Sequence, residues 1–304
     1  MISPQILHGD IPADTWFDRW LPASWRPYSR LMRLDRPIGT WLLLFPCWWS
    51  AAMAAEGWPD LWLFALFAIG AVVMRGAGCT VNDWADRDFD GKVARTAARP
   101  IPSGAVSPRQ ALIFLVAQLL VGLLVLLQLN WFAIGVGAAS LLLVFPYPFM
   151  KRITYWPQAW LGLTFNWGAL VGWAAVRNDL ALAPVLLYIA GVFWTLGYDT
   201  IYAHQDKEDD ILVGVKSTAL ALGENTVAAL WGFYGLALML IAAAGWAAGL
   251  SWPFWPLLAV AAGHLVWQAL RVDINDSSDC LSKFKSNRHF GWLLLLAIVV
   301  GRLW

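Results

Sequence analysis

The chain has 304 residues, of which 60% are hydrophobic and 13% are charged, and its formal net charge is +1. This composition argues against a water-soluble domain and favours a polytopic membrane protein. The small net charge gives no electrostatic basis for binding nucleic acid. The first 36 residues contain prolines and charges but no uninterrupted apolar core, so they predict a cytoplasmic tail rather than a secretory signal.

Nine apolar segments follow the tail, and all but the short ninth are near or above the roughly 20 residues that a membrane-spanning helix needs. Their ranges are 38–55, 61–80, 111–129, 131–150, 155–176, 180–198, 226–250, 252–270 and 290–303. The ninth segment is short and contains Arg302, and the polar run 273–287 before it predicts a loop. The pattern predicts an all-α protein with nine transmembrane helices in a single domain over residues 1–304.

The distribution of basic residues predicts the orientation of these helices. With the N-terminus inside, only Arg177 and Arg302 of the 21 Lys and Arg residues fall on the outer side. The positive-inside rule therefore places the even-numbered connections in the cytoplasm. A bacterial inner membrane is the simplest location that this orientation suggests, with any site at those connections opening to the cytoplasm.

Two aspartate motifs stand at the ends of apolar segments. Asp86 and Asp90 lie four residues apart, and Asp206 and Asp210 repeat that spacing after the sixth segment. Carboxylates without histidine or thiolate partners suit a hard cation such as Mg²⁺, which commonly joins one or two carboxylates to phosphate oxygens. The four aspartates are therefore candidate metal ligands in a magnesium–diphosphate site. The alternative is a pair of solvated loops neutralised by counterions.

Helical spacing would place the polar residues of each motif on one helix face. The first stripe comprises Arg75, Asn82, Asp86 and Asp90, and the second comprises Asp199, Tyr202, Asp206 and Asp210. Two such stripes predict helices that face each other across a polar cavity. Arg99 and Lys151 are the candidate cations for a diphosphate, although basic residues here also serve the positive-inside bias.

Six stretches of the chain resemble the UbiA superfamily of intramembrane aromatic prenyltransferases. Residues 82–90 match the family motif N-D-x-x-D-x-x-x-D, and residues 199–210 match D-x-x-Y-A-x-x-D-x-x-x-D. The other four stretches are residues 33–39, 99–104, 147–152 and 214–218. The similarity runs from about Arg33 to the last apolar segment, and its details are most similar to the ubiquinone branch of the superfamily.

The resemblance implies nine helices around a central cavity, Mg²⁺ as cofactor, a polyprenyl diphosphate donor and 4-hydroxybenzoate as acceptor. It carries the metal ligands over to the four motif aspartates, and the diphosphate contacts to Arg99 and Lys151. Asn82 and Asp83 correspond to the first two residues of the family motif. Beyond the substrates and the lipid bilayer, no obligate protein partner is evident. Asp199 and Tyr202 are candidates to orient or deprotonate the phenol.

Two buried polar residues are candidates for the acceptor pocket. Arg75 precedes Asn82 by two helical turns, about 10.5 Å deeper along the helix, and the carboxylate of 4-hydroxybenzoate would neutralise it. An ion pair within the protein, or a side chain that snorkels to the interface, is the alternative for Arg75. Asn166 lies in the middle of the fifth segment, where an interhelical hydrogen bond is the alternative role.

Other functions remain open on the sequence alone. The same chemistry on homogentisate, dihydroxynaphthoate, haem or a chlorophyll precursor would need the same metal and donor. A cation transporter would also use intramembrane carboxylates, but its aspartates should lie near the middle of the bilayer rather than beside basic loops. A soluble prenyl synthase is excluded by the nine apolar segments.

Overall fold

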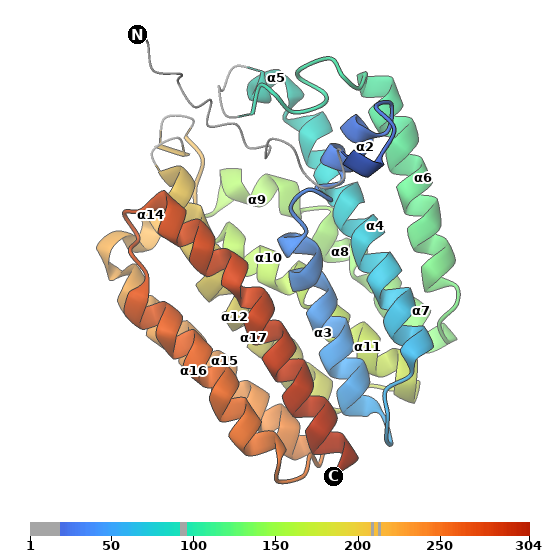
Figure 1. The fold of residues 1–304 in the computed structure, drawn as a ribbon, viewed down its shortest axis with the longest axis vertical. Helices are drawn as coiled ribbons and strands as arrows, with labels where there is room; N and C mark the ends of the chain where they lie inside the picture. Colours follow the sequence, from blue (N-terminus) through green and yellow to red (C-terminus); the bar gives the residue numbers. More distant parts are fainter. Residues whose placement is uncertain (1–18, 92–95, 208–209, 212–213) are drawn as a thin grey trace. The chain divides into compact units, whose positions relative to one another are not determined.

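The computed structural model describes residues 19–91, 96–207, 210–211 and 214–304 (Figure 1). All regular secondary structure in these residues is helical, which confirms the predicted fold class. Six helical stretches of the described part are long and apolar enough to span a membrane, if residues 131–153 and 157–177 are each taken as one stretch, and Ile38–Ala54 forms a shorter apolar helix. By this criterion the structure does not reach the nine predicted spans. The first half of the expected tail, residues 1–18, lies outside the described part.

The chain divides into two compact units, and the first is formed by Met1–Thr40 and Ala68–Gln128. Its helices are α2 (Arg26–Leu31), the beginning of α3 (Ile38–Ala54), most of α4 (Leu61–Ala85), α5 (Arg87–Asp90) and α6 (Pro108–Leu126). A small buried cluster of Leu31, Ile101, Val106 and Ala111 joins α2 to the turn that follows the first motif and to the start of α6. This packing holds the turn that carries Arg99.

The start of α6 is stabilised by its own sequence. Ser107 Oγ accepts a hydrogen bond from Gln110 N at 3.3 Å, and Gln110 Oε1 accepts one from Ser107 N at 2.9 Å, which forms a capping box. Pro108 occupies the first helical turn, where its missing N–H is harmless. Gly104 has a φ of 76°, a left-handed conformation that favours glycine. The turn between Arg99 and α6 is therefore well defined.

The second unit is formed by Trp41–Phe67 and Leu129–Trp304. Besides parts of α3 and α4 it contains α7 (Trp131–Ala139), α8 (Leu141–Val144), α9 (Tyr147–Ile153), α10 (Pro157–Phe165), α11 (Gly168–Arg177), α12 (Leu182–Ala203), η1 (His204–Asp206), α14 (Thr218–Leu222), η2 (Gly223–Asn225), α15 (Thr226–Ala247), α16 (Phe254–Arg271) and α17 (Ser277–Leu303). Helix α16 runs beside α17, as Figure 1 shows in orange and red.

Buried aromatic residues form the core of the second unit. The rings of Trp49 and Trp194 lie 5.0 Å apart, and both indoles are almost fully buried. Trp49 Nε1 donates to Gly291 O at 2.9 Å, and Trp194 Nε1 donates to Asn287 Oδ1 at 2.9 Å. Because each buried N–H has an acceptor, these tryptophans add apolar contact area without an unsatisfied donor. They link α3, α12 and α17.

The fourth and fifth predicted spans are interrupted rather than continuous. Residues 131–153 form α7, α8 and α9, and Pro146 and Pro148 remove two backbone donors near the second break. Residues 157–177 form α10 and α11, which separate at Asn166. Asn166 Nδ2 donates to Gly162 O at 2.9 Å, so its side chain competes with the helical backbone at this position.

The predicted loop at residues 273–287 is wrong for most of its length. Helix α17 begins at Ser277 and continues through the ninth predicted segment to Leu303. Asp276 Oδ1 caps the helix by accepting from Ser278 N at 2.8 Å and from Asp279 N at 3.3 Å. The N-cap Asp276 and the ion pair between Lys283 and Asp279, at 2.6 Å, stabilise a polar helical beginning that hydropathy does not reveal.

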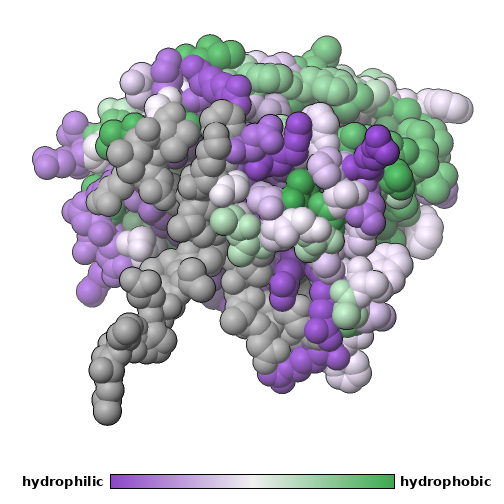
Figure 2. Space-filling model, turned by 90° about the horizontal axis from the view of Figure 1, so that it is seen from above, coloured by the Kyte–Doolittle hydropathy of each residue, from purple (hydrophilic) through white to green (hydrophobic). Residues whose placement is uncertain are grey.

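Exposed tryptophans lie near the ends of several helices, where indole rings suit the headgroup level of a bilayer. Trp58, Trp131 and Trp252 are all largely exposed. In the space-filling view of Figure 2, hydrophilic residues in purple gather on the face turned to the viewer, and hydrophobic residues in green lie toward its margin.

Candidate functional site

The first motif keeps helical backbone geometry beyond the predicted span. Helix α4 continues past Thr80, the end of the predicted span, to Ala85, and a bend at Asp86 separates it from α5. Asp86 N donates to Asn82 O at 2.9 Å, and Asp90 N donates to Asp86 O at 2.8 Å. Because both bonds span four residues, Asn82, Asp86 and Asp90 follow one another at the spacing of one helix face.

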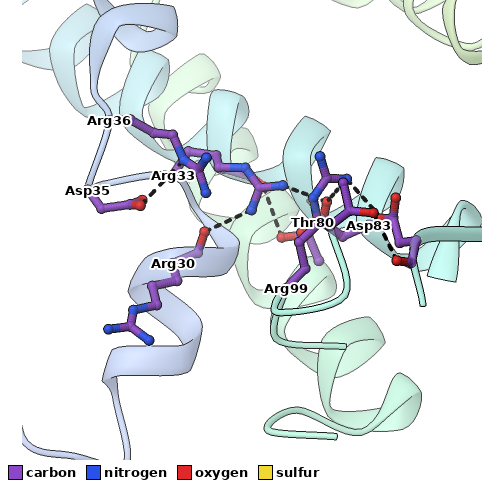
Figure 3. A network of polar contacts seen from close by, with 10 residues as sticks. Arg30, Arg33, Asp35, Arg36, Thr80, Asp83 and Arg99 are labelled. Carbon is purple, nitrogen blue, oxygen red and sulfur yellow. Dashed lines mark hydrogen bonds and ion pairs between the residues drawn. The ribbon is translucent and has the colours of Figure 1, made fainter. Parts of the chain in front are cut away.

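Asp83 is the most deeply buried carboxylate of the first motif. Its Oδ1 atom accepts from Arg33 Nη2 at 2.6 Å and from Arg99 Nη1 at 3.2 Å (Figure 3). The side chain of Asp83 is only 1% exposed, and its Oδ2 atom has no hydrogen-bond partner among the described residues. Two guanidinium groups therefore compensate the charge of one buried carboxylate.

Arg33 was not among the candidate site residues, although it lies in one of the stretches that resemble the family. Its φ is 59°, a left-handed conformation that costs a residue with a side chain about 1 to 2 kcal/mol. Arg33 Nη1 donates to Arg30 O at 3.0 Å while Nη2 binds Asp83. The buried charge of Asp83 is the signal that could have identified Arg33, because such a carboxylate requires a nearby cation.

Arg99 joins two aspartates of the first motif. Its Nη1 atom lies 2.8 Å from Asp90 Oδ2 and 3.2 Å from Asp83 Oδ1. Thr96 Oγ1 donates to Asp90 O at 2.9 Å. Burial raises the pKa of Asp90 above its ordinary value, and the charge of Arg99 opposes that shift. The structure thus brings Arg99 to one of the predicted metal ligands, as well as to Asp83.

Arg75 occupies a space that a glycine leaves open. A Cβ atom at Gly39 would lie 2.6 Å from Arg75 Nε, so the guanidinium packs closely against the first turn of α3. Gly39 belongs to the 33–39 stretch, and Arg75 is on α4 two turns before Asn82. This contact restricts the position of the Arg75 side chain within the first unit.

The second motif does not form one continuous α-helical stripe in the described residues. Asp199 and Tyr202 lie on α12, which ends at Ala203, and residues 204–206 form a tighter 3₁₀ turn. The ring centroids of Tyr202 and Phe284 are 4.5 Å apart. The side chain of Asp206 lies outside the part that the structure describes. The backbone oxygen of Asp210 accepts a hydrogen bond from Val215 N at 2.9 Å.

His204, inside the second motif, has a structural contact. Its Nε2 atom lies 2.9 Å from Thr226 Oγ1. Burial lowers the pKa of His204 to about 4, and the charge of Lys207 acts in the same direction. The imidazole is therefore neutral at pH 7 and links the end of α12 to the start of α15.

Lys151 is brought next to the chain that follows the second motif. Its backbone oxygen accepts from Lys216 N at 2.9 Å. Lys216 Nζ in turn donates to Ile153 O at 3.1 Å and lies 5.3 Å from the centroid of the Tyr155 ring. Two basic residues that are distant in sequence are thus joined through their backbones in the second unit.

Asn166 forms the interhelical hydrogen bond that the sequence left as the alternative to a pocket role. Its Nδ2 atom donates to Thr195 Oγ1 on α12 at 2.8 Å. Thr195 Oγ1 donates to Tyr198 OH at 3.1 Å, which extends the network along α12 toward Asp199. Asn166 Oδ1 is buried and has no partner among the described residues. One acceptor of this side chain thus remains available.

Comparisons with known proteins agree with this architecture. Residues 43–295 match the model of the UbiA prenyltransferase family. The chain is 54% identical over 291 residues to the mitochondrial 4-hydroxybenzoate polyprenyltransferase of Arabidopsis thaliana, covering 95% of this chain and 72% of the relative. It is 53% identical over 286 residues to the corresponding protein of Homo sapiens, covering 93% and 77% respectively.

A solved structure shares the fold. A UbiA homolog from Archaeoglobus fulgidus bound to GPP and Mg²⁺ has a TM-score of 0.63 and 19% identity, covering 90% of this chain and 99% of that chain. The similarity supports an all-helical membrane architecture.

The relatives correct the predicted location. The names of the Arabidopsis and human proteins place them in mitochondria, which contradicts the predicted bacterial inner membrane and the cytoplasmic opening that followed from it. A multi-pass membrane protein remains supported. Charge bias and hydropathy report which helix ends share a side of a bilayer, but they do not identify the membrane.

Proposed function

Because the chain belongs to the UbiA prenyltransferase family, we propose that it transfers a polyprenyl group from polyprenyl diphosphate to 4-hydroxybenzoate. The new bond forms at the ring carbon ortho to the hydroxyl, in a step of ubiquinone biosynthesis. The observation that carries the proposal is the 54% identity, over 95% of the chain, to a relative named for this activity. The fold neighbour that was bound to GPP and Mg²⁺ is in keeping with a diphosphate donor.

The reaction is an electrophilic aromatic substitution. The allylic C–O bond breaks, and the diphosphate leaves with the electron pair. The ring carbon of the acceptor forms the new C–C bond and then loses its proton, which restores the aromatic ring. Groups that stabilise the departing negative charge therefore lower the barrier. Exclusion of water is equally necessary, because water would capture the allylic cation.

Magnesium is the proposed cofactor, and the chemistry of the donor set fits it. The proposed ligands Asp86, Asp90, Asp206 and Asp210 offer only oxygen atoms, which Mg²⁺ prefers. Among the residues that the structure describes, no group of three or more His, Cys, Asp or Glu could hold a metal. When bound, Mg²⁺ supplies positive charge beside the leaving group.

Basic side chains would bind the diphosphate directly. Arg99 has five N–H donors, so it can retain Asp83 and Asp90 while donating to phosphate oxygens. Lys151 would contribute a second cation near the second motif. Asn82 and Asp83 would order the first motif, and Asp83 does so through Arg33 and Arg99.

The acceptor would be held by its two polar ends. Arg75 would bind the carboxylate, and Asn166 would accept a hydrogen bond in the pocket through Oδ1. Asp199 and Tyr202 would orient the phenol or take its proton. We further propose one membrane domain with nine helices around a central cavity. The helices at all nine predicted segments, α16 and α17 included, support this arrangement.

The function is tested by product analysis with the full-length protein in detergent. Given Mg²⁺, a polyprenyl diphosphate and a panel of aromatic acceptors, mass spectrometry should detect prenylated 4-hydroxybenzoate with substitution ortho to the hydroxyl. Preferential prenylation of homogentisate or dihydroxynaphthoate would change the acceptor assignment. Cation flux in proteoliposomes with no prenylated product would contradict the enzyme assignment altogether.

Arg75→Ala should separate the two substrates kinetically. If Arg75 binds the acceptor carboxylate, the KM for 4-hydroxybenzoate should rise by roughly 10-fold or more, because a charge-assisted hydrogen bond contributes about 1.5 to 3 kcal/mol. The KM for the diphosphate should change little. Arg109→Ala, at an exposed arginine on the start of α6, is the matched control. An equal rise in both KM values would remove Arg75 from the acceptor site.

A further inference from the structure

A pocket lies between α16 and α17, away from both aspartate motifs in the sequence. Its volume is about 670 Å³. The α16 side is formed by His264 and Trp267, and the α17 side includes Ser282, Lys285, Arg288 and His289. On α17 the spacing of Ser282, Lys285 and His289 keeps these residues on one helix face. The proposed prenyl-transfer chemistry uses none of them.

The pocket carries uncompensated positive charge. Lys285 and Arg288 both line it, and its lining residues include no aspartate or glutamate. Among the described residues, no carboxylate forms an ion pair with either cation, whereas the neighbouring Lys283 is neutralised by Asp279 at 2.6 Å. Arg288 Nε donates to His289 Nε2 at 3.4 Å. A pocket with this charge favours an anion.

His264 supplies an independent indication of a polar ligand. Both of its ring nitrogens are enclosed, and neither has a hydrogen-bond partner among the described residues. The centroid of the His289 ring lies 6.2 Å from that of His264. A buried imidazole always carries at least one N–H donor, and leaving that donor unsatisfied costs free energy. An oxygen-rich ligand in the pocket would remove this cost.

The position of the pocket along the helices points to a lipid headgroup. Helix α17 is polar from Ser277 to His289 and apolar from Phe290 onward, so the pocket lies where the helix changes character. On α16, Val266 and Leu270 expose apolar side chains beside this region. Basic pockets between membrane helices at the level of the headgroups are suited to anionic lipids.

We propose that the α16–α17 pocket binds the phosphate group of an anionic membrane phospholipid. Lys285 and Arg288 neutralise the phosphate, and His264 donates a hydrogen bond to one of its oxygens. The acyl chains lie along the exposed apolar side chains of α16. Inorganic phosphate has the same oxygen chemistry but lacks the chains, so the two sources can be distinguished experimentally.

The test measures lipid binding to the full-length protein in a non-ionic detergent by native mass spectrometry. Phosphatidylglycerol and cardiolipin should bind more tightly than phosphatidylcholine. The variant with Lys285→Gln and Arg288→Gln should lose roughly 30-fold in affinity for the anionic lipids, since each cation contributes about one kcal/mol. Arg271→Gln removes an exposed cation at the end of α16 outside the pocket and should retain the affinity.

Ser282→Phe distinguishes lipid binding inside the pocket from general attraction of anionic lipids to a positively charged surface. It places a bulky ring in the pocket but keeps both cations, so anionic lipids should bind it more weakly than they bind the wild type. Wild-type affinity in Ser282→Phe, or equal binding of phosphatidylcholine, would overturn the proposal. Displacement of the lipid by inorganic phosphate at equal concentration would assign the pocket to a soluble anion instead. Unchanged prenyl transfer without added anionic lipid would show that the variants are folded.

Discussion

Asp83→Ala is expected to lower the free energy of unfolding by about 3 to 5 kcal/mol, the usual cost of removing one partner from a buried ion pair. The reason lies in the contacts of Asp83 Oδ1 with Arg33 at 2.6 Å and Arg99 at 3.2 Å. Without the carboxylate, both guanidinium groups lose a buried counter-charge. Arg33 would also lose the contact that compensates its left-handed backbone. The rate of prenyl transfer should also fall in Asp83→Ala, because Arg99 is no longer held between two aspartates.

Thermal unfolding in detergent can be followed through the reactivity of the free thiols, since Cys79 and Cys280 are buried in the folded protein. Asp88→Ala is the matched control, because Asp88 lies in the same motif with a side chain that is 79% exposed and 3.8 Å from Arg87. Exposed ion pairs of this kind contribute little to the free energy of unfolding. A melting temperature for Asp83→Ala equal to that of Asp88→Ala would show that the charged cluster does not stabilise the first unit.

Asp86→Ala is expected to reduce kcat by roughly 100- to 1000-fold, the range found when one group that stabilises transition-state charge is removed. Asp86 lies between Asn82 and Asp90 on the helix face of the first motif, where it would hold Mg²⁺. The half-activating Mg²⁺ concentration should rise in the same variant. Steady-state rates over a magnesium titration measure both effects.

Asp88→Ala again provides the control for this experiment, and it should retain wild-type rates and the wild-type magnesium response. The thiol assay should show that Asp86→Ala remains folded, so that a loss of rate is not a loss of structure. If Asp86→Ala kept both the rate and the magnesium response of the wild type, the first motif would not be the metal site.

Hydropathy located helical segments well but did not predict their continuity. All nine predicted segments contain helix, yet the fourth and fifth are broken, at Ser140, near Pro146 and at Asn166. For residues 277–287 hydropathy predicted a loop where the structure has a helix. Capping by Asp276 and the ion pair between Lys283 and Asp279 favour a helix in this polar sequence. Apolarity reports contact with lipid, whereas a helix boundary depends on local hydrogen bonds.

The sequence by itself determined the membrane class, the helical fold, the two aspartate motifs and the likeness to a family, because these depend on composition and on short spacings along the chain. Only the tertiary structure decided which charges meet. Arg33 and Asp83 are separated by 50 residues, and no periodicity relates them. The same holds for Lys151 beside Lys216 and for the pocket between α16 and α17. Such pairings arise because packing brings distant segments together, and a buried charge then requires a compensating partner.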